Sequence, residues 1–313
     1  MKKIIFLAIV SAIVFACSNG PETVGPIDDP TVEPVGTPAA KVYFSNYIYQ
    51  SVGVLDLKKT GEYTDFLNYE QNGLGIPAGI AINPVSKRLY ITEQNGDGGI
   101  IHRINLDSTL YKVVYDSDND LVNPTAVAVD TISKKLYWAD SGTGQIMQGD
   151  LFGSEEQVAL FNGEAVFTSY CYGLAIDHKN NKLYFADNVS RTISVGNLDG
   201  TGQPTIVFDE NNADNVGCPS GLLYTNGNLY WADDCFNSIL MAPADGKVKP
   251  VVLFGEEDGV SFPEGIAIDK ASKKIYWSEI DARVIARGNQ DGTGDREVIL
   301  ESIDAYAIAL DFE

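Results

Sequence analysis

The side chains that could carry out chemistry are few and scattered in this chain of 313 residues. There are two histidines: His102 falls in a predicted third strand of a repeat, whereas His178 falls in a turn. A metal or catalytic centre built on clustered imidazoles is therefore not expected. The sequence also contains no Ser, His and Asp set, P-loop or dinucleotide-binding fingerprint.

Acidic side chains are abundant and offer a different chemistry, the binding of a hard cation through oxygen ligands. Asp116, Asp118 and Asp120 form a DxDxD run that is similar to the start of an EF-hand loop. Leu121 replaces the glycine that this loop requires, and Val127 stands where a bidentate glutamate should be. We expect a solvated acidic loop and no cofactor, with weak Ca²⁺ binding as the alternative.

The elements that position these side chains are defined by an internal repeat. The tetrad Tyr-Trp-Ala-Asp and its variants occur six times, at intervals of 47, 47, 47, 46 and 46 residues. The six copies begin at Tyr43, Tyr90, Tyr137, Tyr184, Tyr230 and Tyr276. A short run of small and apolar residues, such as GIAID from Gly265, precedes each of the last five copies. A further run, AIALD from Ala307, has no tetrad after it.

Each repeat indicates four short strands joined by turns rich in Gly and Asp, and no segment has a convincing helical period. Radial repetition of four-stranded antiparallel sheets is a β-propeller, so the repeats predict an all-β fold of six blades. We expect AIALD to be the inner strand of the blade that residues 41–67 begin. Pairing of these two segments would then close the ring.

The tetrads, the GIAID strands and the turns NLDGTG (197–202) and NQDGTG (289–294) resemble the YWTD β-propeller, the class B repeat of the low-density lipoprotein receptor family. The resemblance covers residues 41–313. Two copies depart from it, because Ile91 replaces the aromatic second residue and Asn46 replaces the acid. The resemblance implies that the acids closing the tetrads are structural and that a propeller face binds a ligand. Endocytic receptor function is not implied, since this chain has no EGF-like or cysteine-rich modules.

The residue before each inner strand is expected to ring the mouth of the central channel. These residues are Ala78, Thr125, Tyr172, Ser220, Glu264 and Tyr306. Only Glu264 is ionisable at neutral pH, which favours a binding mouth over a metal cage. Nearby aromatic residues suit a protein, peptide or glycan ligand, and they are Phe167, Tyr170, Phe236 and Phe262. The alternative is a metal-dependent, Ca²⁺-type lactonase or hydrolase of the gluconolactonase-like propeller class.

The cysteines predict one disulfide. Cys218 and Cys235 flank the dipeptide Asn226-Gly227, which favours a type I′ hairpin. Counting outward from this turn places the two cysteines directly opposite each other, where a disulfide can close. A bridge between Cys171 and Cys218 in adjacent blades is the alternative. Otherwise Cys171 is expected to be a buried thiol.

Charge separates the two faces of the predicted disc. The net charge of −21 excludes a nucleic-acid partner. The turns after the inner strands lie on the face that we call the bottom, and they hold Lys87, Arg88, Lys134, Lys135, Lys179, Lys182, Lys273 and Lys274. The six connections between blades lie on the opposite face, the top, and contain fourteen Asp or Glu residues and no Lys or Arg. We expect the top face to be acidic and to bind a basic ligand.

The N-terminal segment indicates export. Residues 1–16 contain two lysines followed by an uncharged apolar run, which is typical of a signal peptide. The run ends in VFAC and resembles a bacterial lipobox, in which Cys17 would become the lipidated N-terminus. An ordinary signal peptide cleaved near Ala16 is the alternative. Residues 17–40 contain five prolines and predict a solvated tether. Ser18 favours transport to an outer membrane.

The sequence therefore predicts a signal peptide (1–16), a lipidated tether (17–40) and a propeller (41–313). The expected protein is an envelope lipoprotein, attached to the membrane through its lipid. Its propeller is expected to be a non-catalytic binding module.

Overall fold

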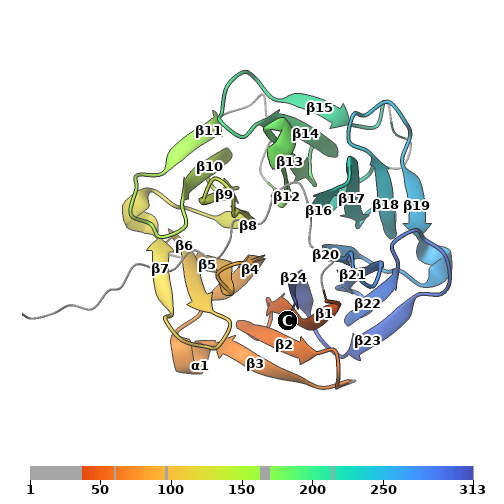
Figure 1. Ribbon diagram of the computed structural model, residues 1–313, viewed down its shortest axis with the longest axis horizontal. Helices are drawn as coiled ribbons and strands as arrows, with labels where there is room; N and C mark the ends of the chain where they lie inside the picture. Colours follow the sequence, from red (N-terminus) through yellow and green to blue (C-terminus); the bar gives the residue numbers. More distant parts are fainter. Residues whose placement is uncertain are drawn as a thin grey trace, which may run out of the picture. The chain divides into compact units, whose positions relative to one another are not determined.

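The computed structural model describes residues 37–59, 61–95, 98–162, 170–211, 213 and 216–312. The predicted signal peptide, the lipidation site Cys17 and most of the tether lie outside the described residues, as does Phe167. Within the described ranges the protein is all-β and forms six sheets of four antiparallel strands each (Figure 1). No helix in these ranges is long and apolar enough to cross a membrane. The prediction of six blades is confirmed.

We number the blades in chain order and give their strands from the axis outward (Figure 1). Blade 1 holds β24 (Ala305–Phe312), β1 (Ala39–Asn46), β2 (Ser51–Asp56) and β3 (Tyr63–Asn68). Blade 2 holds β4 (Ile76–Asn83), β5 (Arg88–Asn95), β6 (Gly98–Asn105) and β7 (Lys112–Tyr115). Blade 3 holds β8 (Pro124–Asp130), β9 (Lys135–Asp140), β10 (Gln145–Asp150) and β11 (Val158–Asn162).

Blade 4 holds β12 (Cys171–Asp177), β13 (Lys182–Asp187), β14 (Thr192–Asn197) and β15 (Thr205–Phe208). Blade 5 holds β16 (Pro219–Thr225), β17 (Asn228–Asp233), β18 (Ser238–Pro243) and β19 (Val251–Phe254). Blade 6 holds β20 (Pro263–Asp269), β21 (Lys274–Glu279), β22 (Val284–Asn289) and β23 (Glu297–Glu301). The short helical turns are α1 (Tyr69–Asn72), η1 (Ser117–Asn119), η2 (His178–Asn180) and η3 (Glu256–Asp258).

The ring closes within blade 1, where β24 pairs with β1 in antiparallel register (Figure 1). In this pairing Tyr43 lies opposite Ala309. The backbone N–H of Ala39 also donates a hydrogen bond to Asp269 of blade 6, at 2.9 Å. The predicted closure by the AIALD segment is therefore confirmed.

The tetrad recurs because its first two side chains contact the two neighbouring blades, as successive residues of a strand point to opposite faces of the sheet. The Tyr137 hydroxyl of blade 3 donates to the Leu198 carbonyl of blade 4 at 3.5 Å. Trp138 points the other way and stacks on Tyr115 of blade 2, with ring centroids 4.8 Å apart. The tetrad tryptophans of blades 5 and 6 stack in the same way on the blade before them.

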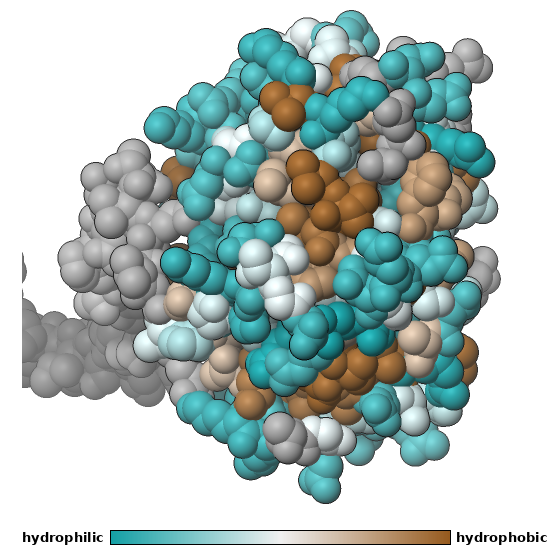
Figure 2. Space-filling view, turned by 90° about the vertical axis from the view of Figure 1, so that its right-hand side faces the viewer, coloured by the Kyte–Doolittle hydropathy of each residue, from teal (hydrophilic) through white to brown (hydrophobic). Residues whose placement is uncertain are grey.

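The fourth strands supply the rings on which these tryptophans stack. In β7, β15 and β19 the first two residues are exposed and the last two are buried. In blade 2, Ile91 replaces the aromatic second residue of the tetrad. It packs in one cluster with Leu67 of β3 in blade 1, so an aliphatic residue there takes the place of the aromatic ring. The exposed residues of β19 include Val251 and Val252, at 54% and 43% exposure. Figure 2 faces this side of the ring and shows apolar residues among polar ones.

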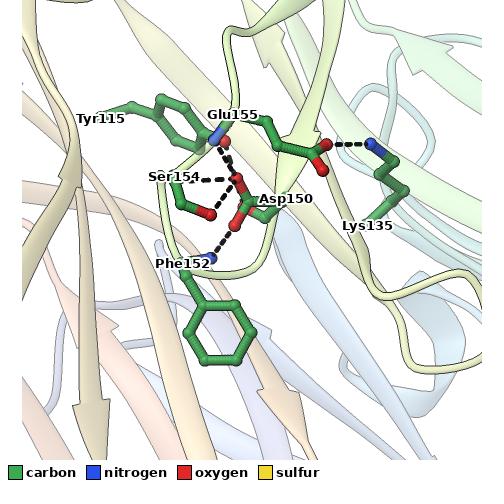
Figure 3. A network of polar contacts seen from close by, with 6 residues as sticks. All are labelled: Tyr115, Lys135, Asp150, Phe152, Ser154 and Glu155. Atoms are coloured by element: carbon green, nitrogen blue, oxygen red, sulfur yellow. Dashed lines mark hydrogen bonds and ion pairs between the residues drawn. The ribbon is translucent and has the colours of Figure 1, made fainter.

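The turn after β10 shows how a carboxylate organises the bottom of a blade (Figure 3). Asp150 accepts hydrogen bonds at 2.5 to 2.8 Å from three backbone N–H groups, those of Phe152, Ser154 and Glu155. Burial raises the pKa of Asp150, but these bonds outweigh it and hold the pKa below the ordinary value. The Tyr115 hydroxyl of blade 2 donates to the Asp150 carbonyl at 3.1 Å. The turn thus also joins two blades.

The inner strands are built from small residues because they come very close to one another at the axis. A Cβ atom on Gly221 would lie 2.3 Å from the Glu264 carbonyl oxygen, and one on Gly265 would lie 2.5 Å from that of Tyr306. These distances exclude a side chain, so the close approach of the backbones requires glycine there.

Candidate functional site

The six inner strands enclose a cavity of about 290 Å³ on the axis of the propeller, with a mostly aliphatic lining. Three of the predicted mouth residues, Tyr172, Glu264 and Tyr306, line it and supply its ionisable side chains. Each is the second residue of its inner strand, β12, β20 or β24. The three side chains therefore lie at the top end of the cavity, where the connections between blades enter.

Glu264 is the carboxylic acid of this mouth, and its side chain is buried at 5% exposure. Burial and the nearby charge of Asp234 raise the pKa of Glu264 to about 8, although a hydrogen bond with Ser220 acts against them. Among the described residues, no Lys or Arg forms an ion pair with Glu264. At neutral pH the site therefore holds a proton that a bound cation would displace.

Two tyrosines stand beside Glu264. The rings of Tyr172 and Tyr306 meet edge to face, with centroids 5.6 Å apart, and Tyr170 follows at 5.9 Å from Tyr172. Burial raises the pKa of Tyr172 to about 12 and that of Tyr306 well above its ordinary value. Both phenols are therefore neutral near pH 7 and can donate or accept hydrogen bonds.

A second acid, Asp234, lies within electrostatic range of Glu264 although it is not part of the cavity lining, and it was missed from the sequence. Asn188 of blade 4 donates to the Asp234 carboxylate at 2.9 Å and to the Cys218 carbonyl at 3.2 Å. Burial raises the pKa of Asp234, as does the charge of Asp233, whereas the Asn188 hydrogen bond lowers it. The signal in the sequence was available, because Asn188 and Asp234 each follow directly on a tetrad, at the top end of a second strand.

Thr125 and Ser220 do not reach the mouth, which corrects the expectation that they line it. Their exposures are 1% and 0%, and they are not part of the cavity lining. The Thr125 hydroxyl donates to the Cys171 carbonyl of the next blade at 2.5 Å. The Ser220 hydroxyl similarly donates to the Glu264 carbonyl at 3.2 Å. Ala78, also expected at the mouth, is buried and absent from the lining.

The physical reason is a β-bulge at the mouth position of every inner strand. In β16, for example, Pro219 lies opposite Asp233 but Leu222 lies opposite Trp231, so the extra residue shifts the register. A bulge re-aims a side chain, so counting along the strand does not decide whether it points to the axis or into the next blade.

Within the described residues, hydroxyl groups link five of the six neighbouring pairs of inner strands. Each hydroxyl donates a hydrogen bond to a backbone carbonyl of the next blade, and the five donors are Ser45, Thr92, Thr125, Ser220 and Ser278. Where the third tetrad residue is Ser or Thr, that residue supplies the hydroxyl. In blades 3 and 5 this residue is Ala139 or Ala232, and the mouth position supplies it instead. Blade 4 combines Ala186 with Tyr172, whose side chain lines the cavity.

The predicted disulfide between Cys218 and Cys235 is formed, with Cα atoms 5.2 Å apart, and Cys171 is a buried free thiol. Asn226 and Gly227 both have positive φ, as a type I′ turn requires. The cysteines are not directly opposite, however, because the β16 bulge shifts the register by one residue. The described residues contain one group of possible metal ligands, Cys218, Asp234 and Cys235. Its two sulfurs are joined to each other, so it is not a metal site.

The other residues singled out for chemistry have structural contacts. In blade 2, His102 Nε2 lies 2.6 Å from a carboxylate oxygen of Glu93. His178 of blade 4 lies elsewhere, with its Nδ1 2.8 Å from a carboxylate oxygen of Asp130 in blade 3. In the DxDxD run, the Asp116 carboxylate caps η1 by accepting a hydrogen bond from the backbone of residue 118, at 3.0 Å. Weak Ca²⁺ binding by this run stays a prediction.

The top face also carries basic residues, which lie outside the connections between blades. The turns between second and third strands also lie at the top, and they include Arg191 and Arg283. Arg283 forms a bidentate pair with Asp304, at 2.7 and 2.9 Å, and so neutralises one acid of the top face. The described Asp234, in contrast, has an amide partner in Asn188 and no ion pair with a Lys or Arg of the described chain.

No protein-family model matches the chain. Protein cueball of Drosophila ananassae is 33% identical over 87 residues, which are 27% of this chain and 13% of that protein. Protein cueball of Drosophila sechellia is 35% identical over 89 residues, which are 28% of this chain and 14% of that protein. The chain thus covers about one seventh of the length of these curated relatives.

Similar solved structures cover most of the chain. A chain in the nidogen/laminin complex has a TM-score of 0.71 and 20% identity, covering 86% of this chain and 97% of that one. TolB from Acinetobacter baumannii has a TM-score of 0.65 and 11% identity, covering 87% of this chain and 66% of that one. At such identities the likeness shows the fold alone, a β-propeller.

Proposed function

We propose that the protein is a lipid-anchored module of the bacterial cell envelope that binds a basic protein, peptide or glycan ligand at the top of its propeller, without catalysis. The fold-level likeness to a chain from a nidogen/laminin complex supports a protein ligand for this kind of scaffold. The acidic connections between the blades support a ligand of positive charge.

One observation carries this proposal: Glu264 at the mouth and Asp234 near it are largely buried, and neither forms an ion pair with a basic residue of the described chain. A buried carboxyl group without a counter-ion is costly to ionise. Buried acids with raised pKa values beside a concave site are typical of functional positions. A cation supplied by the ligand would remove this electrostatic cost.

Exposed aromatic side chains around the mouth support a macromolecular ligand. Tyr170, Phe236 and Phe262 are 45%, 47% and 36% exposed. Phe236 belongs to the same top turn as Asp234, and the backbone N–H of Phe262 donates to Asn237 of that turn at 2.8 Å. Aromatic anchors beside charged groups are characteristic of binding hot spots. These residues would surround a basic side chain held at the carboxylates.

The binding test uses an immobilised propeller and a panel of lysine-rich and arginine-rich peptides, measured at low and high salt. We expect Glu264→Gln combined with Asp234→Asn to weaken binding about tenfold or more, and salt to weaken binding by the wild type. Glu155→Gln is the matched control, because it removes a carboxylate from the bottom face. Equal losses in both variants would contradict the proposal. Ca²⁺-dependent turnover of a lactone that is lost in Glu264→Gln would replace it by the hydrolase.

The envelope location is proposed from the lipobox ending at Cys17, and the outer membrane from Ser18. A Cys17→Ser variant is expected to leave the membrane fraction while the propeller stays folded. Retention of this variant in the outer-membrane fraction would contradict lipid anchoring.

A further inference from the structure

We propose that the axial cavity is a binding site for a primary alkylammonium group, carried by a free amine or by a lysine side chain of the partner, with Glu264 holding the nitrogen at the mouth. The inference deepens the proposed function and rests on it, because it names the group that the mouth accepts.

The composition of the cavity wall argues for an amphipathic ligand. Below the mouth, the lining consists of apolar side chains and glycines of the inner strands, including Leu310 and Phe312 of β24. The ionisable groups are confined to Glu264 and the two tyrosines at the top. A ligand that matches this pattern has one charged end and one apolar end. The volume, about 290 Å³, corresponds to about ten water molecules.

The polar end should be a cation, because the mouth contains a buried acid that lacks a counter-ion among the described residues. Asp234 adds a second acidic group within electrostatic range, and the rings of Tyr172 and Tyr306 offer π-faces or edges to the ligand. An ammonium over a tyrosine face gains a cation–π contribution that grows as water is excluded. The hydroxyls of Tyr172 and Tyr306 are hydrogen-bonded to each other, and a hydroxyl oxygen with two lone pairs can still accept a further hydrogen bond.

The geometry favours an ammonium over other cations. A Ca²⁺ ion takes about six to eight oxygen ligands, whereas Glu264 is the one carboxylate in the described cavity lining and Asp234 lies near it. Asp234 is already engaged by Asn188 at 2.9 Å. A guanidinium pairs with a carboxylate in a planar, bidentate arrangement, which needs room for the whole planar group. Glu264 is buried at 5% exposure and stands beside two rings, which suits a compact donor on a narrow alkyl stem.

The experiment is calorimetric titration of the full propeller with n-alkylammonium ions from ethyl to octyl, at pH 8.5. Each is compared with the n-alkanol of the same length, which keeps the tail but lacks the charge. We expect the dissociation constant to fall about three- to fourfold per added methylene, which corresponds to ~0.8 kcal/mol. Each alkanol should bind at least about tenfold more weakly than the matching ammonium. N-acetyl-lysine amide forms a separate arm that tests the protein-borne source.

Two variants assign the binding to the cavity. Glu264→Gln should remove the advantage of the ammonium over the alkanol, while Ala81→Leu, which adds bulk to the cavity wall, should remove the gain with chain length. Circular dichroism and the melting temperature establish that each variant is folded. Unchanged titrations in Glu264→Gln, or equal affinity for alkanol and ammonium, would overturn the inference.

The arms also separate this inference from the proposed function. If basic peptides bind the top face in a salt-sensitive manner but no alkylammonium ion binds, the cavity inference fails and the proposed function stands. If neither binds, both fail. Displacement of an alkylammonium ion by N-acetyl-lysine amide identifies a lysine side chain as a source of the group, whereas binding that requires long free tails identifies a free amine.

Discussion

The Ser278 hydroxyl of blade 6 donates a hydrogen bond to the Tyr306 carbonyl of blade 1 at 2.6 Å, and the Gly265 N–H donates to the same oxygen atom of Ser278 at 2.9 Å. One hydroxyl thus connects the inner strand of its own blade to that of the next. Among the described residues, the junction from blade 4 to blade 5 lacks this link, since Ala186 and Tyr172 occupy the two positions that supply it elsewhere.

Ala186→Ser should supply the missing link and raise the free energy of unfolding by about 1 kcal/mol, the usual contribution of one hydrogen bond. By analogy with Ser278, the new hydroxyl would lie between the Gly173 N–H and the Ser220 carbonyl. Urea unfolding measures the change. Ala139→Ser is the control, because Thr125 already provides the hydroxyl in blade 3. An equal gain in both variants would show that the junction is not the cause.

Arg296→Ala should be strongly destabilising. Arg296 Nε lies 2.7 Å from a carboxylate oxygen of Glu279, whose side chain is fully buried, and removing the arginine leaves that charge without its partner. The expected loss in unfolding free energy is about 3–5 kcal/mol. Arg287→Ala breaks a pair of similar geometry, 2.9 Å, with the exposed Glu297, and should cost at most about 1 kcal/mol. Comparable losses would contradict the role of burial.

The stability of the protein should fall between pH 5 and pH 9 because of Glu264. Its pKa is raised from 4.5 to about 8 in the folded state, so folding is favoured by the protonated form. That contribution is complete below pH 4.5, is lost as the pH rises towards 8, and is constant above. The unfolding free energy should therefore decrease less across this pH range in Glu264→Gln than in the wild type. The difference between the two decreases is at most about 5 kcal/mol.

The titratable groups near Glu264 are Asp234, Tyr172 and Tyr306. The charge of Asp234 raises the pKa of Glu264, and the hydrogen bond with Ser220 lowers it. Raising the pH removes the proton from Glu264, so binding of a cation at the mouth should strengthen up to about pH 8 and then level off. Identical pH profiles for wild type and Glu264→Gln would assign the effect to Asp234 or to another acid.

Reduction of the Cys218–Cys235 disulfide should destabilise the protein by about 3 kcal/mol, since the bridge closes a loop with a sequence separation of 17. Thermal unfolding with and without reductant measures the change. The double variant Cys218→Ala, Cys235→Ala should unfold at the same temperature under both conditions. Its remaining described cysteine, Cys171, is a free thiol and forms no disulfide that the reductant could break. A wild type that is indifferent to reductant would refute the prediction.

The blade count and the closure of the ring were predictable because each tetrad residue has a fixed task. Tyr137 and Trp138 reach into opposite neighbours, so a blade cannot lose either without leaving a gap in the interface. The substitution of Ile91 was tolerated because Leu67 faces it. A repeat under such constraints keeps its period, and the period sets the fold.

The candidate site was predicted only in part, because side-chain direction at the mouth is decided by bulges. Tyr172, Glu264 and Tyr306 line the cavity, but Thr125 and Ser220 turn into the next blade to replace a hydroxyl that the tetrad lacks. That exchange depends on two residues in different strands and is not visible in either alone. Asp234 was missed because its position depends on the top turn and on Asn188 of another blade.

Because β24 pairs with β1, the first strand of the propeller obtains its inner neighbour from the last strand of the chain. Until residues 305–312 are in place, β1 presents an open edge whose backbone donors and acceptors are free to pair with a wrong strand. A chain that ends before residue 305 would keep this edge of β1 unpaired.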